Sequence, residues 1–341
     1  MDIFDWFKNR PAQFDPERLS DELVLQAIDK AVLLINPRLK LVGSYRECLS
    51  PVVKNCIHYL RVLIRSLPST ITVASSCWVS EPSLRAFFVT ASDIPVTLSH
   101  STNLRTLFDK YPELEEAHFV LEMKYSEQHV YGMSLLGDVL QREVSQKALS
   151  FSEHQARICG HTELEIKRLL GSQCFEYLVA QALSEIGDER SERRELEDNR
   201  ALIRARLRLF QQQGPGLGSV FGTAPDVIAE QLKLETQLQE NERQMEAIGS
   251  PRSALDKELE CLCEVLGHPE RYLQMEPRKT CLTTMNVVLD EPKGEASLEV
   301  EFSLAELNGI PKLQRAFVLG RLGRDQLPPM RSGFENADRY L

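Results

Sequence analysis

One stretch of the chain decides the fold expected for it. From residue 185 to residue 248 it reads EIGDERSERRELEDNRALIRARLRLFQQQGPGLGSVFGTAPDVIAEQLKLETQLQENERQMEAI. Its first part belongs to a helical pattern that runs from residue 162 to about residue 212. An unbroken helix of that length spans about 75 Å at 1.5 Å per residue, which is more than a compact domain needs.

The segment that follows this helix is rich in glycine, at residues 214–222. A phosphate-binding loop is one interpretation, but a strand should precede such a loop and a Gly-Lys-Ser/Thr motif is missing after it. The segment is therefore expected to be a flexible connection between two helices.

The helix expected after this connection begins with Asp226 as its cap and contains a heptad pattern. Its core positions recur at steps of 4, 3, 4 and 3, at Leu234, Leu238, Asn241, Met245 and Ile248. We predict that it folds back on the preceding helix, which supplies the apolar residues Leu196, Ile203, Leu207 and Phe210. Asparagine at a core position fixes the register of such a pair, at some loss of stability.

The segments on the N-terminal side predict two helices and then a sheet. Ser20 caps a helix that ends before Pro37, and a second helix is expected to begin at Ser50 and end before Pro68. From residue 117 the apolar period changes to two, which indicates strands. With a polar turn at residues 126–128 and further strands up to residue 158, we expect an antiparallel meander of three to five strands.

The C-terminal segment returns to a period of two. The clearest strand covers residues 296–304, where every second residue is apolar, and a second strand is expected at residues 281–289. Residues 290–294 would join them as a hairpin loop. Residues 315–322 fit either a strand or a helix.

These patterns together predict a helix-rich α+β fold, in which small antiparallel sheets pack on helices and a long, coiled-coil-like antiparallel helical hairpin is inserted. Residues 1–160 would form an α+β body. Residues 161–267 would form the helical arm, with its glycine-rich tip near residues 214–222. Residues 268–341 would return to the body as a β-hairpin segment and end in a basic, frayed tail.

Composition excludes several classes of protein. The chain has 341 residues, with 40 Lys plus Arg against 50 Asp plus Glu, a formal net charge of −10. An acidic balance argues against a chain devoted to nucleic acid, and 43% hydrophobic residues argue against disorder. The first residues do not resemble a secretory signal, and the apolar runs are too short to cross a membrane. We therefore expect a cytoplasmic protein that needs no cofactor.

A basic row is expected on one side of the second helix, formed by Lys54, His58, Arg61 and Arg65. Four such side chains on one helix face can bind a line of anions, which makes a nucleic acid or a phosphate ligand an alternative partner. The other interpretation is a solvated face that pairs with carboxylates of the chain itself.

Metal binding and catalysis find little support in the sequence. His154, Cys159, His161 and Cys174 are the weak candidates for a metal site, but their spacing matches no recurrent zinc motif, so no metal is expected. The eight cysteines include no Cys-x-x-Cys pair. Nucleophile elbows, zinc-protease motifs and calcium loops are missing too, so no residue is named as catalytic.

The preferred hypothesis for the function follows from the helical hairpin. A long arm with one apolar seam offers an extended surface rather than a pocket, which favours binding of a partner protein or self-association. The sequence thus predicts a cytosolic adaptor or scaffold-like protein. An enzyme whose active site lies between sheet and helices stays open as an alternative, because catalytic residues need not be neighbours in sequence.

Overall fold

The computed structural model describes residues 20–136, 139–213, 224–248, 251–289, 297–309 and 312–328. The predicted glycine-rich tip, the predicted hairpin loop at 290–294 and the C-terminal tail lie outside these ranges. The chain divides into two compact units. The first comprises Met1–Cys56 and Val179–Gly267, and the second comprises Ile57–Leu178 and His268–Leu341. The long helices α3 and α7 each contribute residues to both units.

The first unit is helical. Its elements are α2 (Asp21–Ile35), η1 (Pro37–Leu41), the first part of α3 (Tyr45–Arg65), the later part of α7 (Glu163–Gln213), α9 (Ala224–Ile248) and α10 (Pro251–Gly267). Ser20 caps α2 as predicted, since its hydroxyl accepts the backbone N–H of Leu23. The core is formed by one face of each of four helices, with Ile28, Val53, Ala182 and Leu262 fully buried.

Two predicted helix starts in this unit are wrong. Helix α3 begins at Tyr45 rather than at Ser50, so Pro51 lies inside the helix. A proline there removes only one backbone hydrogen bond of the early helix, and buried Leu49 and Val53 on either side compensate by packing. Helix α9 begins at Ala224, which places Asp226 inside it rather than at its cap.

The second unit combines a sheet with helices on both of its sides. Its further elements are β1 (Ile71–Thr72), η2 (Ser75–Cys77), α4 (Pro82–Phe87), α5 (Asp93–Ser99), α6 (Thr102–Lys110), β2 (Glu116–Leu136), β3 (Val139–Gly160), η3 (Pro269–Arg271), β4 (Leu273–Leu282), β5 (Leu298–Leu307), β6 (Leu313–Gly323) and η4 (Arg324–Gln326). The strand order is β3-β2-β6-β5-β4, all antiparallel, and the short β1 pairs with β6 in parallel.

The C-terminal strands thus join the earlier strands in one sheet, through nine residue pairs from Glu116 with Gly323 to Lys124 with Arg315. The segment that follows β4 extends to β3, at the other end of the strand order, and this contact curls the sheet. The backbone N–H of Val288 donates to Lys147 on β3 at 2.8 Å, and Leu149 donates back to Asn286 at 2.9 Å. The fold is the helix-rich α+β class that the sequence predicts.

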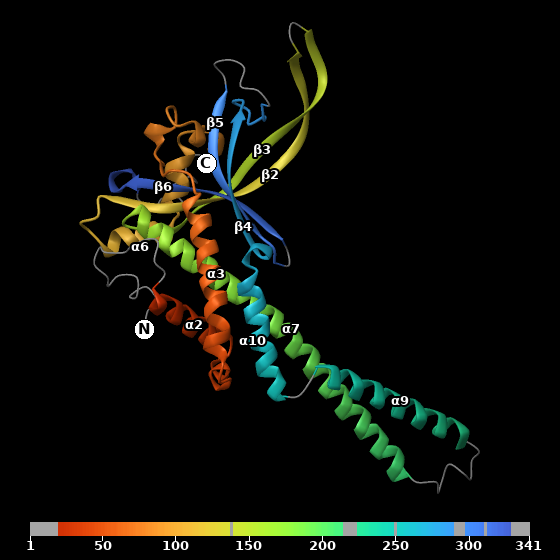
Figure 1. Ribbon diagram of the computed structural model, residues 1–341. Coiled ribbons are helices and arrows are strands. Elements are labelled where there is room, and N and C mark those ends of the chain that lie inside the picture. The colour runs from red at the N-terminus through yellow and green to blue at the C-terminus, as the bar shows by residue number, and fades with distance from the viewer. Residues whose placement is uncertain are drawn as a thin grey trace, which may run out of the picture. The chain divides into compact units, whose positions relative to one another are not determined.

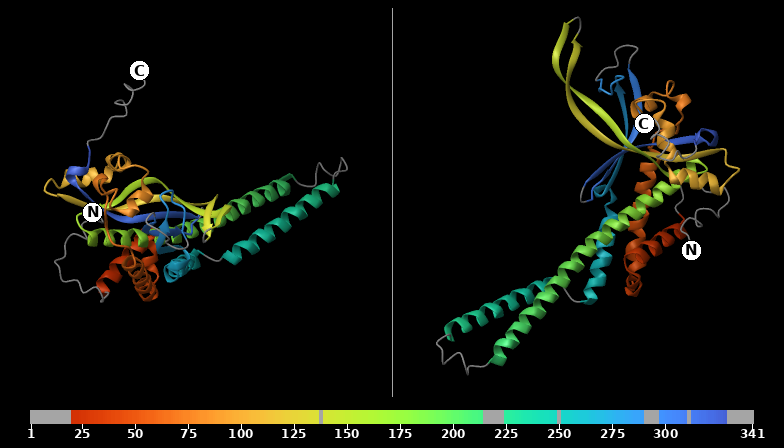
Figure 2. Two further views of the ribbon diagram at one scale, coloured as in Figure 1. Left: turned by 90° about the horizontal axis from the view of Figure 1, so that it is seen from above. Right: turned by 180° about the vertical axis from the view of Figure 1, so that it is seen from behind.

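Both faces of the sheet are buried in its central part, where β6 lies between β2 and β5. Helices α4, α5 and α6 cover one face, where Phe119, Phe302 and Val318 belong to the main apolar core. On the other face Val120, Phe317 and Leu319 are also buried, and the first part of α7 runs along it (Figure 2, left). There the hydroxyl of Tyr59 on α3 donates to the carbonyl of Leu273 at 2.8 Å.

The predicted meander is wrong in its strand count. No turn interrupts residues 126–128, because they pair in register with residues 148–150 and β2 continues to Leu136. The expected strands between 138 and 158 are likewise one strand, β3. The strand predicted at 281–289 is also misplaced, since β4 ends at Leu282. Residues 315–322 are a strand, which was one of the two alternatives.

A cluster of charged groups marks the point where β2 leaves β6 and continues with β3 alone. The Tyr125 hydroxyl donates to Glu127, whose carboxylate is also 3.1 Å from both Arg278 and Lys147. The Tyr125 bond, followed by Lys147 and Arg278, lowers the pKa of Glu127 below its ordinary value of 4.5. Burial and the neighbouring carboxylate raise the pKa of Tyr125.

This cluster predicts a pH effect. A carboxyl group with a lowered folded-state pKa stabilises the protein fully above its unfolded-state pKa, and loses that contribution as the pH falls through the folded-state value. Glu127→Gln should therefore lower the urea midpoint more at pH 7 than at about pH 3. Equal differences between wild type and variant at both pH values would contradict this, and Glu276→Gln, at an exposed position of β4, serves as control.

Candidate interaction arm

The later part of α7 and helix α9 form a two-helix hairpin, which we call the arm and define as residues 190–213 and 224–248. The two helices run antiparallel in every view (Figures 1 and 2). The seam predicted from the heptads is their least exposed side. On α9, Leu234 and Asn241 are buried, and Leu238 and Met245 are half-buried.

The seam is looser on α7. Leu196, Ile203 and Leu207 are half-buried, and no described side chain of α7 between residues 187 and 208 is fully buried. The side chains of the predicted seam residues Phe210 and Ile248 lie outside the described set. Arg193 and Arg200 are also half-buried at the intervening heptad positions, which the sequence interpretation missed. Two arginines in a seam of about two to three heptads leave the arm little apolar contact of its own.

Polar contacts fix the register of the arm. Asn241 donates its side-chain N–H to the carbonyl oxygen of Leu196 across the helix pair, at 3.1 Å. Eight residues beyond Leu196 on α7, Arg204 forms an ion pair with Glu242 at 2.7 Å. The side-chain oxygen of Asn241 is buried without a partner in the described part of the chain. This is the register-setting asparagine that the heptad predicts, with one of its polar atoms unsatisfied.

Asn241→Leu should therefore stabilise the helix pair while weakening its register. We expect a higher midpoint for the loss of arm helicity, by an amount equivalent to about 1 kcal/mol, because a buried unsatisfied oxygen is removed. Circular dichroism on thermal unfolding measures it, with exposed Leu232→Asn as the control. A lower midpoint for Asn241→Leu would show that the Leu196 bond outweighs the unsatisfied oxygen.

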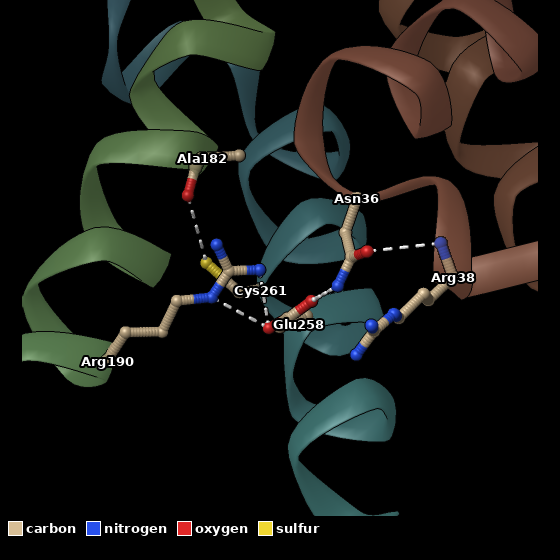
Figure 3. A network of polar contacts seen from close by, with 6 residues as sticks. All are labelled: Asn36, Arg38, Ala182, Arg190, Glu258 and Cys261. Atoms are coloured by element: carbon tan, nitrogen blue, oxygen red, sulfur yellow. Dashed lines mark hydrogen bonds and ion pairs between the residues drawn. The ribbon is translucent and has the colours of Figure 1, made fainter. Parts of the chain in front are cut away.

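A polar clamp lies at the base of the arm (Figure 3). The carboxylate of Glu258 on α10 accepts from Nε and Nη2 of Arg190 on α7, at 2.9 and 2.6 Å. Its other oxygen accepts from the side-chain N–H of Asn36 at 2.7 Å. Asn36 ends α2 and also caps η1, because its own oxygen accepts the backbone N–H of Arg38 at 3.0 Å. One buried carboxylate thus ties three segments together.

Sequence reasoning missed this clamp, although a signal exists. Glu258 falls on the apolar side of α10, beside Leu255, Leu259 and Leu262. Its side chain is only 10% exposed, and a charge in that position must be paired, because desolvating an unpaired carboxylate is too costly. A charged residue at an apolar position of a helix is the pattern that points to such a clamp.

The clamp lines an open pocket of about 450 Å³, and the residues around it come from α2, η1, α7 and α10. Arg38 lines its edge without an ion pair to any described side chain, whereas the charge of Arg190 is already matched by Glu258. Only one unmatched charge therefore faces the pocket. Such an arrangement holds helices together and provides no pair of groups for acid–base chemistry.

The predicted basic row on α3 is not a line of free cations. Lys54 forms an ion pair with Asp21 at 2.8 Å, which also lowers the pKa of Asp21. Burial, and then the neighbouring Arg65, lower the pKa of Arg61 below its ordinary value. His58 is exposed. The ion pair of Lys54 fits the alternative interpretation, in which this helix face pairs with carboxylates of the chain itself. Anion binding by Lys54, His58, Arg61 and Arg65 stays an untested prediction.

The four metal candidates do not come together. His154 stacks on Phe88 with ring centroids 4.5 Å apart, whereas His161 bonds to Glu165 at 3.0 Å. Burial raises the pKa of the Cys159 and Cys174 thiols to about 12, which disfavours the thiolate that zinc requires. Across the described ranges, no three His, Cys, Asp or Glu side chains converge as metal ligands.

The remaining features of the described chain point to the arm as the candidate site. None of the described helices carries an apolar stretch long enough to span a bilayer. Among the described residues, specific polar contacts hold both the seam, which the sequence predicts, and the clamp at its base, which it does not. Comparison of the chain with protein-family models, curated proteins and solved structures finds no match.

Proposed function

We propose that the protein is a non-enzymatic, cytoplasmic adaptor that uses the arm to bind a partner protein or a second copy of itself. The observation that carries this proposal is the course of α7 beyond the clamp. The helix continues from Arg190 to Gln213, about 35 Å at 1.5 Å per residue. In the described chain, the hydrogen bonds and ion pairs that residues 194–208 make with other elements all go to α9.

The exposure of the arm supports the same role. Among the side chains that the structure describes, α7 contributes no buried residue past Ile186, and α9 contributes only Leu234 and Asn241. Large apolar side chains are exposed on both helices, with Leu202 at 51% and Leu232 at 58%. A pair of ordered helices that adds few residues to the core is typical of an element that docks on a partner.

Site-specific photocrosslinking tests the proposal. A benzophenone side chain is placed on the arm at Leu202 or Leu232, and at two control positions away from it that are more exposed, Val79 and Met285. The full chain is then irradiated in an extract of its source organism. We expect discrete protein adducts from the two arm positions and none from the controls. Adducts from all four positions alike, or from none, would contradict the proposal.

A shortened arm is the matched second variant. Removing residues 200–206 together with 231–237 deletes one heptad from each helix, about 10 Å, and keeps the Asn241 register. The shortened chain should keep the urea midpoint of the full chain, because Leu234 is the single buried side chain among those that the structure describes in the deleted segments. A benzophenone at Gln239, an exposed arm position outside the deleted segments, should give an adduct in the full chain and none in the shortened chain. Unchanged adducts would show that the distal arm does not bind the partner.

A further inference from the structure

No close packing within the described chain explains why residue 187 is a glycine. Gly187 lies inside α7, where glycine is less favourable than alanine. At Gly171, an added Cβ would come within 2.9 Å of Ile64, so close packing explains that glycine. At Gly187, an added Cβ would meet nothing within 4 Å. A glycine at an open position of a helix is explained if another chain approaches the helix there.

The side of α7 that faces away from the seam continues this pattern. Small residues recur on it at helical spacing, and all of them are exposed: Ala180, Ser184, Gly187 and Ser191. Three turns further along the same side come Leu202, which is 51% exposed, and Ala205. The half of this face from Ala180 to Ser191 carries only small side chains, so another helix can approach it closely. The other half carries the larger side chain of Leu202.

The charges of α7 are segregated along the same length. Residues 185–198 contain seven acidic and three basic side chains, a net charge of −4. Residues 200–208 contain four arginines and no acidic residue, a net charge of +4. Of these arginines only Arg204 has an ion pair among the described residues, with Glu242. Arg206 and Arg208 are exposed, as are Asp188 and Glu192 in the acidic segment.

From the open glycine and this charge pattern together, we infer that α7 is a self-pairing surface: two copies of the chain associate through the outer faces of α7 in an antiparallel, two-fold arrangement centred near residue 198. This inference rests on the proposed role of the arm and names its partner as a second copy. The basic segment of each copy then lies along the acidic segment of the other, as an isologous interface requires. Ala205 of one copy comes opposite Ser191 of the other.

The size of this surface sets the strength of the pairing. The segments that overlap, residues 185–208, span about 36 Å, and a helix is about 10 Å wide, so the interface buries well under about 1,200 Å² in total. Interfaces of that size are weak and reversible. The dimer should therefore form only at high concentration and should weaken with salt, because exposed charges are screened.

Charge-swap variants test the inference. The acidic variant carries Arg206→Glu and Arg208→Glu, and the basic variant carries Asp188→Lys and Glu192→Lys. None of these four exposed side chains makes a contact in the described chain that the fold needs. We expect the weight-average mass of the wild type to rise from one chain toward two between about 5 and 500 µM in light scattering. Each variant alone should remain a monomer, and an equimolar mixture of the two should form the dimer again.

The outcomes separate this inference from the proposed function. A wild type that stays monomeric up to about 500 µM overturns self-pairing, and so does a variant that still dimerises. A mixture that does not restore the dimer overturns the antiparallel arrangement. Arm adducts with another protein would leave the proposed function standing in each of these cases. The control Lys233→Glu, a single charge reversal on α9, should leave the wild-type mass curve unchanged.

Discussion

Phe302→Ala should lower the free energy of unfolding by about 3–5 kcal/mol, the largest effect that we expect from one substitution in this chain. Phe302 is fully buried on β5. Its ring packs against Phe151 and Tyr125, with centroids 5.3 and 5.7 Å apart. Removing the ring loses the free energy gained when it is transferred from water into the core. It also leaves a cavity that the strands around it cannot close.

Urea unfolding measures this loss against two controls. Phe302→Leu keeps most of the volume and should lose about half as much. Tyr131→Ala removes a ring of similar size that is 80% exposed on β2, and should change the unfolding free energy by about 0.5 kcal/mol or less. A loss below about 1.5 kcal/mol for Phe302→Ala would mean that the sheet does not enclose this residue as described.

Glu258→Ala should have the second largest effect, a loss of about 2–3 kcal/mol. The change removes the acceptor of three hydrogen bonds, two from Arg190 and one from Asn36. Asn36 loses its only side-chain acceptor in the described chain. The side chain of Arg190 is 46% exposed, so water replaces part of what it loses, and the expected effect is smaller than for a fully buried pair.

A double-mutant cycle isolates the ion pair within this clamp. Glu258→Gln keeps an oxygen for Asn36 but removes the charge, and Arg190→Met keeps the length of the side chain. We expect the two losses to be non-additive by about 1 kcal/mol in urea unfolding. Additive losses would show that Arg190 and Glu258 do not interact in solution. The pair Arg243 and Glu240, exposed on α9, should show little coupling in the same experiment.

The elements with regular apolar patterns could be predicted from the sequence. The cap at Ser20, the long helix α7, the Asn241 seam and the alternation in β5 are all local signals, and burial in the structure follows them. The same holds for the fold class, because a sheet and an amphipathic helix must each bury an apolar face.

The errors have physical causes in particular residues. Residues 126–128 are polar and resemble a turn, but they lie in a two-stranded part of the sheet whose faces tolerate polar side chains. Strand β4 contains Glu276, Pro277, Arg278 and Lys279, which do not resemble a strand. It is an edge strand, where proline and charge are allowed, and its partner β5 supplies the alternation.

The candidate site could be predicted only where it depends on periodicity. The heptad positions of α9 indicate the seam, whereas the clamp depends on Asn36, Arg190 and Glu258, which are far apart in the sequence and meet only after folding. The segregation of charge along α7 is visible in the sequence. The sequence alone does not show that this segregation belongs to an outer surface. That follows from the open position of Gly187 and the exposure of Leu202 in the structure.

Amide hydrogen exchange of the full chain at two concentrations tests the central claim most directly. If the arm serves association rather than the core, amides of residues 194–208 and 232–246 should exchange much faster than those of residues 255–266 in dilute protein, and slow down when the protein is concentrated or its partner is added. Arm amides that exchange as slowly as those of residues 255–266, whatever the concentration, would show that the arm is an integral layer of the fold and would contradict this account.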